Sequence, residues 1–389
     1  MPVIPEIAAF HDEMTAWRRD FHMHPELGFH EVRTSESVAA RLAGFGLDVH
    51  RGLGGTGVVG TLRAGAGNGC IGLRAGMDAL PIEERNDVAH RSHHPGRMHA
   101  CGHDGHTAML LGAARHLAST RDFDGTVHFI CQPAEDGLGG AKAMIADGLF
   151  EKFPVDAIYA LHNAPRRALG TFYTRSGPLM AASNDFDIVV RGRGAHAARP
   201  ENGVDPVVTS AHVVTALQTV VSRNVSALDT VVLSVTQIHG GTTYNVIPEE
   251  VKIAGNVRAY RPEVIDRIEA AIGRIAQGVA ATFGASIGYE FRRKYPPLVN
   301  HARETAIAAD AAAAVVGESR VERNGPPRTA SEDFSFMLQA KPGAFIFLGG
   351  GDGDGIADVH NPHYDFNDAM LPIGASYFAR LVEMVLPKR

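Results

Sequence analysis

The chain has 389 residues, 45% of them hydrophobic, and a formal net charge of −6. This length exceeds the size at which single hydrophobic cores usually stop growing, so we expect one large and one smaller domain. With a pI near 6.4 and no run of like charges, the composition argues against nucleic acid or an anionic membrane as a partner.

The three cysteines are scattered and too few for a disulfide framework, which favours a reducing compartment. The first ten residues lack the basic and apolar regions of a secretory signal, and no stretch of about 18 apolar residues occurs elsewhere. We therefore expect a soluble cytoplasmic protein.

The N-terminal part of the chain alternates between helical and strand-like patterns of apolar residues. The predicted helices cover residues 7–21, 34–45, 107–117 and 141–146, and the predicted strands cover 57–62, 70–74, 126–131 and 157–161. Such alternation is typical of an α/β fold with a mostly parallel sheet that is covered on its faces.

Near residue 183 the pattern changes to the order β-α-β-β-α-β. The predicted strands cover 186–191, 231–238, 251–257 and 286–291, and the helices cover 204–222 and 262–283. This order is that of the ferredoxin-like split β-α-β motif. We therefore expect residues 183–294 to form an inserted α+β domain, and residues 1–182 and 295–389 to form the main domain.

After residue 295 the chain returns to alternating helices and strands. The predicted elements are helices at 302–316, 331–338 and 372–386, a strand at 344–348 and a Gly/Asp-rich loop at 349–358.

Nine residues of the main domain concentrate metal-binding side chains. Residues 98–106 read Met-His-Ala-Cys-Gly-His-Asp-Gly-His and offer a thiolate, imidazoles and a carboxylate. Because a predicted helix follows at once, the segment lies at a strand-to-helix junction, a usual position for sites in α/β proteins. A His-rich surface loop is the alternative, since the chain has 20 histidines and several precede this segment.

Further metal donors follow other predicted strands. Together with the cluster they give sulfur, nitrogen and oxygen ligands suited to two divalent metals. The candidates are Cys101, His103, Asp136, His162 and His360. Glu135 lies beside Asp136 and is a candidate for accepting a proton from a metal-activated water. Taken singly, a Glu-Asp pair in a solvated loop and a structural strand-end histidine remain alternatives.

Six motifs, in chain order, resemble the hippurate hydrolase-like branch of the aminoacylase/carboxypeptidase family of dinuclear metallohydrolases, which contains N-acyl-L-amino acid amidohydrolases. The motifs lie at residues 18–26, 77–82, 98–106, 132–135, 161–163 and 359–361. The resemblance covers nearly the whole chain. It implies a metal-binding catalytic domain interrupted by a lid and dimerisation domain, a homodimer, and two divalent ions per subunit, with manganese, zinc, cobalt and nickel as candidates.

By motif, the five candidate donors match the metal ligands of this family, and Glu135 matches its general base. Asp78 matches a position behind the metals, where it would orient a ligand. One position departs from the family pattern, because the usual second glutamate is Asp136, which is one methylene shorter. The carboxylate can still bind metal, but the spacing and preference of the metals become open questions.

The resemblance also assigns roles in the inserted domain. His196 matches a lid histidine that enters the active site of the partner subunit and stabilises the oxyanion. Asn245 and Arg258 match positions that help to hold the carbonyl or carboxylate of the substrate, and a bidentate guanidinium suits a free carboxylate. Without the resemblance, His196 reads as a loop histidine and Arg258 as a solvated strand residue.

The implied activity is metal-dependent hydrolysis of N-acyl amino acids with a hippurate-like, aryl-acetyl or acetyl acyl group. Glu135 removes a proton from water held by the metals, the hydroxide attacks an amide carbonyl polarised by metal and His196, and Glu135 protonates the leaving amine. The products are a carboxylic acid and an amino acid.

Other functions stay open at this point. A metallo-carboxypeptidase or dipeptidase, a metal-bound protein that has lost hydrolysis, and a dimeric scaffold whose polar residues are merely solvated are the alternatives. A serine hydrolase is disfavoured because the chain has no Gly-x-Ser-x-Gly elbow. Cys101 is better suited to metal ligation than to nucleophilic attack, because a histidine lies two residues away and three more donors are available.

Overall fold

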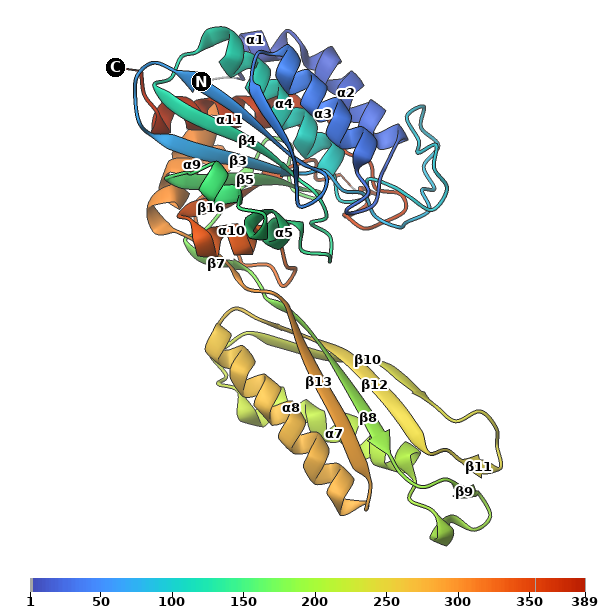
Figure 1. Cartoon of the computed structure of the whole chain (residues 1–389). Helices are drawn as coiled ribbons and strands as arrows, with labels where there is room; N and C mark the ends of the chain where they lie inside the picture. The colour runs from blue at the N-terminus through green and yellow to red at the C-terminus, as the bar shows by residue number, and fades with distance from the viewer. Residues whose placement is uncertain (1–2, 354, 389) are drawn as a thin grey trace. The chain divides into compact units, whose positions relative to one another are not determined.

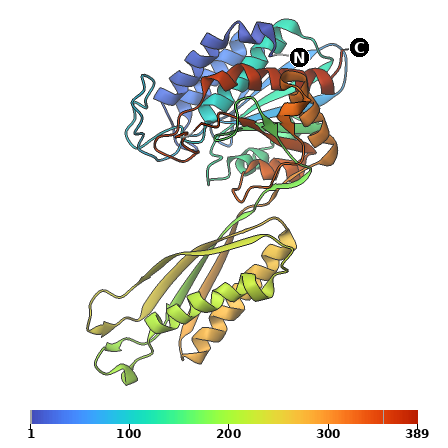
Figure 2. The same ribbon diagram turned by 180° about the vertical axis from the view of Figure 1, so that it is seen from behind.

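The computed structural model describes residues 3–353 and 355–388. The chain forms two compact units (Figures 1 and 2). The first comprises the residues up to Leu179, the segment Val299–Pro326 and the chain from Glu332 onward, and the second comprises Met180–Leu298 and Pro327–Ser331. Within the Gly/Asp-rich loop predicted over 349–358, Asp354 lies outside the described residues.

The first unit is built on an eight-stranded sheet with the order β1-β2-β4-β3-β5-β16-β6-β15. The strands are β1 (Asp48–Leu53), β2 (Gly57–Ala64), β3 (Cys70–Gly76), β4 (Gly125–Gln132), β5 (Ala157–Ala164), β6 (Phe172–Tyr173), β15 (Val321–Glu322) and β16 (Gly343–Gly349). The four central strands, β4, β3, β5 and β16, are mutually parallel, whereas β2 is antiparallel to β4. All residues of β5 and β16 are buried, which explains the unbroken apolar runs at 157–161 and 344–348.

Helices cover both faces of this sheet (Figure 1). The helices are α1 (Pro5–Ala8), α2 (His11–Met23), α3 (Val32–Gly44), α4 (His103–Thr120), α5 (Gly140–Ala146), α6 (Leu149–Lys152), α9 (Ala302–Val316), α10 (Phe334–Ala340) and α11 (Leu371–Val385). α4 contacts the central strands and is flanked by α2, α3 and α11, whereas α5 and α10 pack together against β4 and β5. The predicted α/β class with a mostly parallel, covered sheet is confirmed.

Small residues let the neighbours of α4 approach closely. A Cβ at Gly374 of α11 would lie 2.0 Å from the sulfur of Met109, and one at Gly112 would lie 2.4 Å from the sulfur of Met14. Because α4 is surrounded in this way, almost all its residues are buried, and its N-terminal turn has little freedom to move.

The second unit contains a four-stranded antiparallel sheet with the order β10-β12-β8-β13. Its elements are β8 (Ser183–Arg191), α7 (Pro206–Asn224), β10 (Val231–Gly240), β12 (Glu250–Ala259), α8 (Pro262–Thr282) and β13 (Ser286–Tyr295). This is the expected ferredoxin-like arrangement. Alternate side chains of β8 and β12 are buried against α7 and α8, so one face of the sheet forms the core.

Several elements were not predicted because they are short or polar. They are β1, β6, β7 (Gly177–Met180), β14 (Leu298–Asn300), β15, α6 and the pair β9 (Ala195–His196) and β11 (Val246–Ile247). The helix predicted at 7–21 is divided into α1 and α2, and the helix predicted at 331–338 begins only at Phe334. Among the described residues, no helix combines the length and apolar character that crossing a membrane requires.

Candidate metal centre

Five predicted metal donors come together in the first unit. Cys101 lies in the turn before α4, and His103 is the first residue of that helix. His162 lies on β5, while Asp136 and His360 lie in loops. Cys101 and His103 are only 5% and 1% exposed, which excludes the alternative of a His-rich surface loop.

The donor atoms form two overlapping groups. The sulfur of Cys101 lies 3.4 Å from Nε2 of His162, and these two residues with His103 offer three ligand atoms within 4.8 Å of one another. Nε2 of His360 lies 3.4 Å from Oδ1 of Asp136, and these two residues form a second such group with Cys101. The thiol of Cys101 thus belongs to both groups.

The chemistry of the cluster fits divalent metal ions. Nε2 of His103 and Oδ2 of Asp136 are buried without a hydrogen-bond partner, an arrangement that is costly unless another ligand completes it. Burial, followed by the charges of Asp136 and Glu135, raises the pKa of the Cys101 thiol well above its usual value. A cation would offset both effects, and thiolate, imidazole and carboxylate are ligands that zinc-like metals accept.

The backbone between Cys101 and His103 requires a glycine. Gly102 has a φ of +91°, and a Cβ at this position would lie 2.8 Å from both Oδ1 of Asn163 and the hydroxyl of Tyr364. Only glycine adopts this conformation without strain. The turn directs the two donors on either side of it toward the same cluster.

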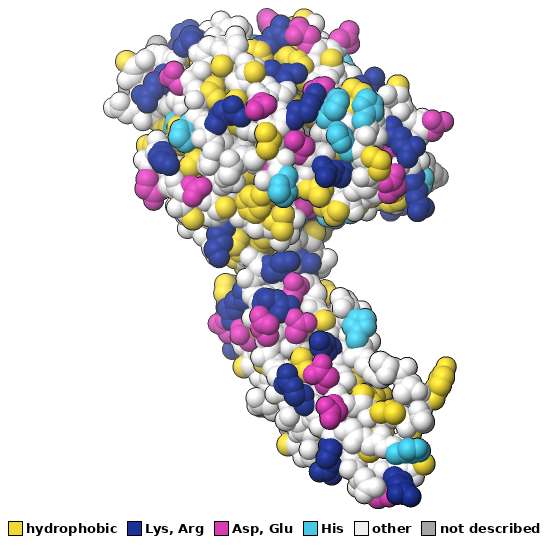
Figure 3. All heavy atoms as spheres, turned by 45° about the vertical axis from the view of Figure 1, so that its right-hand side comes forward, with side chains coloured by type: hydrophobic (Ala, Val, Ile, Leu, Met, Phe, Trp, Pro, Cys, Tyr) yellow, Lys and Arg dark blue, Asp and Glu magenta, His cyan; other side chains and the backbone are white. Residues whose placement is uncertain are grey.

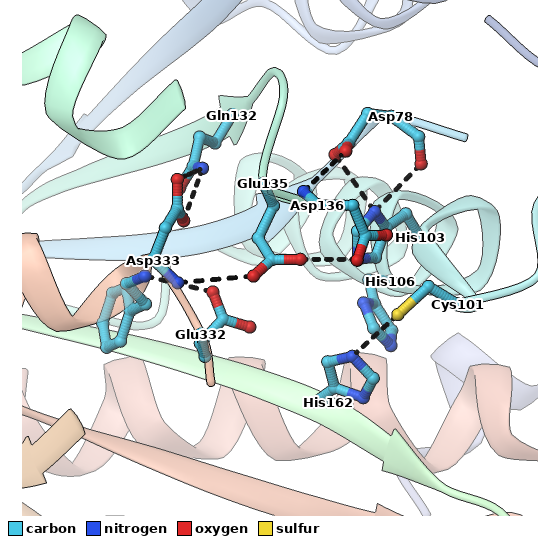
Figure 4. Close-up of polar contacts among 12 residues, drawn as sticks. Asp78, Cys101, His103, His106, Gln132, Glu135, Asp136, His162, Glu332 and Asp333 are labelled. Carbon is cyan, nitrogen blue, oxygen red and sulfur yellow. Dashed lines mark hydrogen bonds and ion pairs between the residues drawn. The ribbon is translucent and has the colours of Figure 1, made fainter. Parts of the chain in front are cut away.

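Asp78 orients two of the ligands (Figure 4). Its Oδ1 accepts a hydrogen bond from Nδ1 of His103 at 3.1 Å, and its Oδ2 accepts one from the backbone N–H of Asp136 at 2.9 Å. Burial alone would raise the pKa of Asp78, but His103 and the backbone donors lower it to about 2. Because Nδ1 of His103 carries the proton, its Nε2 is available to a metal.

Glu135 lies between the donor cluster and a second group of carboxylates. Its Oε2 is 3.7 Å from Nε2 of His103, and its Oε1 accepts the backbone N–H of Asp333 at 3.3 Å. Burial, followed by the charges of Glu332 and Asp136, raises the pKa of Glu135 well above its usual value. The carboxylate of Glu135 therefore lies beside the metal ligands, but it belongs to neither of the two groups of three donor atoms described above.

The backbone around the site is locally strained. Ala134, which precedes Glu135, has a φ of +51°, and His360 has a φ of +64°. Non-glycine residues adopt this region at a cost of about 1 to 3 kcal/mol, and they do so mostly at functional sites.

Sequence reasoning missed His106 as a supporting residue. Its Nε2 lies 2.7 Å from Oδ1 of Asn163, whose Nδ2 donates to the hydroxyl of Tyr364 at 2.7 Å. The ring centroids of His106 and His162 are 4.5 Å apart. His106 was visible in the motif at 98–106, but only the fold reveals that it packs against a ligand.

Sequence reasoning also missed a buried charge network around Arg74. Nη2 of Arg74 lies 2.9 Å from Oε1 of Glu332 and 3.0 Å from Oδ1 of Asp333. Gln132 donates to both oxygens of Asp333 at 2.8 and 2.9 Å. Figure 4 shows the backbone N–H of Asp333 directed toward Glu135 and its carboxylate directed toward Gln132, with Glu332 beside Glu135. The role of these two acids was not predicted, because the pattern over 331–338 predicts a helix and indicates no contact with Arg74.

The other predicted site residues lie in the second unit. His196 on β9 pairs with Val246 on β11, and the N–H of Ala197 donates to the carbonyl of Asn245 at 2.9 Å, so His196 and Asn245 are neighbours. Both are exposed. The structure therefore brings these two residues together at the end of the sheet where β12 begins.

Arg258 lies at the opposite end of β12. Eight residue steps of about 3.3 Å separate it from Glu250, so it lies about 26 Å from the end of the sheet that carries His196. The guanidinium is partly buried, donating from Nε to Asn256 at 2.6 Å and from Nη1 to Ser331 at 2.8 Å.

A cluster of sulfur, nitrogen and oxygen ligands with a buried carboxylate beside it is the arrangement of a metal-dependent hydrolase. Peptidase family M20/M25/M40 matches residues 72–384, and the chain belongs to this family. The family predicted from the motifs is confirmed.

Individual relatives match nearly the full length. The chain is 41% identical to a hippurate hydrolase of Campylobacter jejuni over 98% of each protein. It is 37% identical to an N-acetylcysteine deacetylase of Bacillus subtilis, over 97% of this chain and 98% of the relative. The crystal structure of Bacillus subtilis YxeP, described as a dinuclear metal binding peptidase of family M20, matches with a TM-score of 0.85 and 31% identity, over 97% of this chain and 99% of that one.

Proposed function

We propose that this protein is a metal-dependent amidohydrolase that cleaves N-acyl amino acids into a carboxylic acid and an amino acid. The observation that carries the proposal is the buried carboxylate of Glu135 beside a cluster of five metal donors. The relatives support the substrate class, because hippurate and N-acetylcysteine are both N-acyl amino acids.

Two divalent metal ions are the proposed cofactor. The residues that would hold them are Cys101, His103, Asp136, His162 and His360. When bound, such ions lower the pKa of water and polarise an amide carbonyl. Manganese, zinc, cobalt and nickel are the candidates, and the shorter side chain of Asp136 is the feature that separates this chain from the usual family pattern.

Glu135 is the proposed general base and acid. Its Oε2 faces the ligand cluster, so it can accept a proton from the attacking water and pass it to the nitrogen of the leaving amine. Asp78 keeps His103 in the tautomer that binds metal, and the burial of His103 and Glu135 keeps bulk water away from this part of the site.

His196, Asn245 and Arg258 are the proposed substrate-facing residues of the second unit. An oxyanion donor at His196 and a carboxylate fork at Arg258 suit the two polar ends of an N-acyl amino acid. Because Arg258 lies about 26 Å from the end of the sheet that carries His196 and Asn245, a substrate of this size cannot touch both ends within one chain.

In a homodimer, residues from both ends of the sheet can contact one substrate, because the two ends come from different subunits. In it, His196 of the partner subunit, together with its neighbour Asn245, would complete a site whose metal ligands, Glu135 and Arg258 come from this chain. β10 is an edge strand of the second-unit sheet and carries exposed Val232 and Ile238, so it is the proposed dimer contact.

The proposed partner is a small molecule rather than nucleic acid or membrane. On the face shown in Figure 3, Lys and Arg side chains are interspersed with Asp and Glu, and a mixed pattern of this kind does not attract a polyanion. The cytoplasm is the proposed location, because Cys101 must remain a reduced thiol to bind metal.

A substrate panel tests the proposal. Hydrolysis of hippurate, N-acetyl amino acids and indole-acetyl amino acids should be measured beside C-terminal peptides and dipeptides, together with the metal content of the protein. We expect N-acyl amino acids to be preferred. A preference for peptides would identify a carboxypeptidase or dipeptidase, and bound metal without any hydrolysis would identify a binding protein.

A further inference from the structure

A short segment of the second unit leads directly to the carboxylates around Glu135. This segment, residues 327–331, is here called the strap, and it groups with the second unit although the chain on both sides belongs to the first. The backbone N–H of Ala181 donates to the carbonyls of Arg328 and Ala330, both at 3.0 Å. Met180 and Arg328 also form a parallel bridge.

The end of the strap is held by a side chain. Nη1 of Arg258 on β12 donates to the hydroxyl of Ser331 at 2.8 Å, and Nε of the same guanidinium donates to Asn256. Because both contacts fix the guanidinium, Ser331 is tied to the C-terminal end of β12, an inner strand of the second-unit sheet.

The next two residues are fixed within the first unit. Glu332 and Asp333 are buried, and Nη2 of Arg74 lies 2.9 to 3.0 Å from a carboxylate oxygen of each. Asp333 also accepts hydrogen bonds from Gln132 and from the backbone N–H of Ala141 at 2.8 Å. Since Arg74 lies on β3 and Gln132 on β4, the sheet sets the position of the pair.

The pair holds the loop that carries Glu135. The backbone N–H of Asp333 donates to Oε1 of Glu135 at 3.3 Å (Figure 4). Gln132, three residues before Glu135, is bound to the Asp333 side chain. Asp333 therefore contacts both the start of the loop and the carboxylate at its end, leaving Oε2 of Glu135 directed toward His103.

We propose that Asp333 is a positioning residue for Glu135 and that the strap makes this positioning depend on the second unit. The inference rests on the proposed role of Glu135 as general base. A displacement of the second unit moves Ser331, and the peptide bond to Glu332 transmits the movement to the N–H group that holds Glu135. Misplacing a catalytic group by about 1 Å can lower the rate by on the order of a hundredfold.

The first variant to test is Ser331→Ala, which removes only the hydroxyl that accepts from Arg258. We expect kcat to fall on the order of tenfold while KM and metal content stay at wild-type values. Ser331→Thr keeps the hydroxyl and should restore kcat. The matched control is Ser226→Ala, which removes a hydroxyl that accepts a backbone N–H of Leu228 in a loop of the same unit, and its kcat should equal that of the wild type.

The second variant is Asp333→Asn, which keeps the backbone N–H but replaces the carboxylate that contacts Arg74 and Gln132. We expect kcat to fall on the order of a hundredfold, again with unchanged metal content. If this buried variant fails to fold, the kcat of Ser331→Ala still tests whether the strap positions Glu135. A raised KM with wild-type kcat in Ser331→Ala would show that Arg258 serves only substrate binding and would overturn the inference.

Glu135→Gln separates this inference from the proposed function. If Glu135→Gln is inactive while Ser331→Ala has wild-type kcat, the strap has no role and the proposed function stands. If Glu135→Gln retains full activity, the general base has been misassigned and the proposed mechanism fails as well.

Discussion

Glu135 and Asp136 are neighbours in the sequence, but their carboxylates have different surroundings. Glu135 is buried and contacts the backbone of Asp333, whereas Oδ1 of Asp136 lies 3.4 Å from Nε2 of His360. Because the backbone before them turns through Ala134 with a positive φ, adjacent side chains can diverge. The geometry supports one acid as a metal ligand and the other as a proton acceptor.

Glu135→Gln tests that division. The change keeps size and hydrogen bonding but removes the proton acceptor, so kcat should fall on the order of a hundredfold or more while metal content is unchanged. Glu304→Gln, which alters another buried glutamate in α9, is the control and should retain wild-type kcat. Loss of metal in Glu135→Gln would reverse the roles assigned to the two acids.

Asp136→Glu tests the departure from the family pattern. Both side chains offer carboxylate oxygens and differ only in reach, so the variant should still bind metal and hydrolyse N-acyl amino acids. Metal content and kcat of the two proteins should be compared side by side. A variant without metal would show that the loop has adapted to the shorter side chain.

At the scale of elements, α2 is joined to the first turn of α4 by a buried charge network. His22 on α2 contacts Asp104 at 2.8 Å and Glu84 at 3.2 Å, and Nε of Arg18 lies 2.9 Å from Asp104. Asp104 directly follows the ligand His103. The network therefore anchors the turn that presents the metal donors.

This network predicts a pH dependence of stability. Burial alone would lower the pKa of His22, but the hydrogen bonds that its imidazole donates to Asp104 and Glu84 raise it to about 9, above the 6.5 of the unfolded chain. The contribution of His22 is therefore complete below pH 6.5 and is lost as the pH rises through about 9.

Unfolding free energies of the wild type and His22→Gln, measured near the two ends of this pH range, test the prediction. The advantage of the wild type should shrink by up to about 3 kcal/mol with rising pH. An advantage that is constant with pH would show that His22 is not protonated in the folded protein.

The sequence predicts those parts of the fold and site whose causes are local. The unbroken apolar run of β5 and the alternation along β8 are visible without the structure, and so is the string that contains Cys101 and His103. β1 was missed because it is largely exposed and polar. The Arg74 network was missed because its partners lie 258 and 259 positions away, and no local pattern reports such a contact.

At the scale of the whole molecule, the separation of His196 from Arg258 along the second-unit sheet predicts a functional homodimer. Mixing His196→Ala with Glu135→Gln should restore part of the activity after subunit exchange, because one site of each mixed dimer keeps both residues. Each variant alone, treated identically, is the control. Mixed dimers that form, as detected by mass, but stay inactive would place His196 in its own subunit's site or outside catalysis.

The most direct test of the account is hippurate hydrolysis before and after removal of metal. Because five donors converge and two of their buried atoms have no hydrogen-bond partner, we predict that chelation abolishes hydrolysis and that manganese, zinc or cobalt restores it. Metal content measured on the same samples should follow the activity. Full activity in metal-free protein would contradict the account.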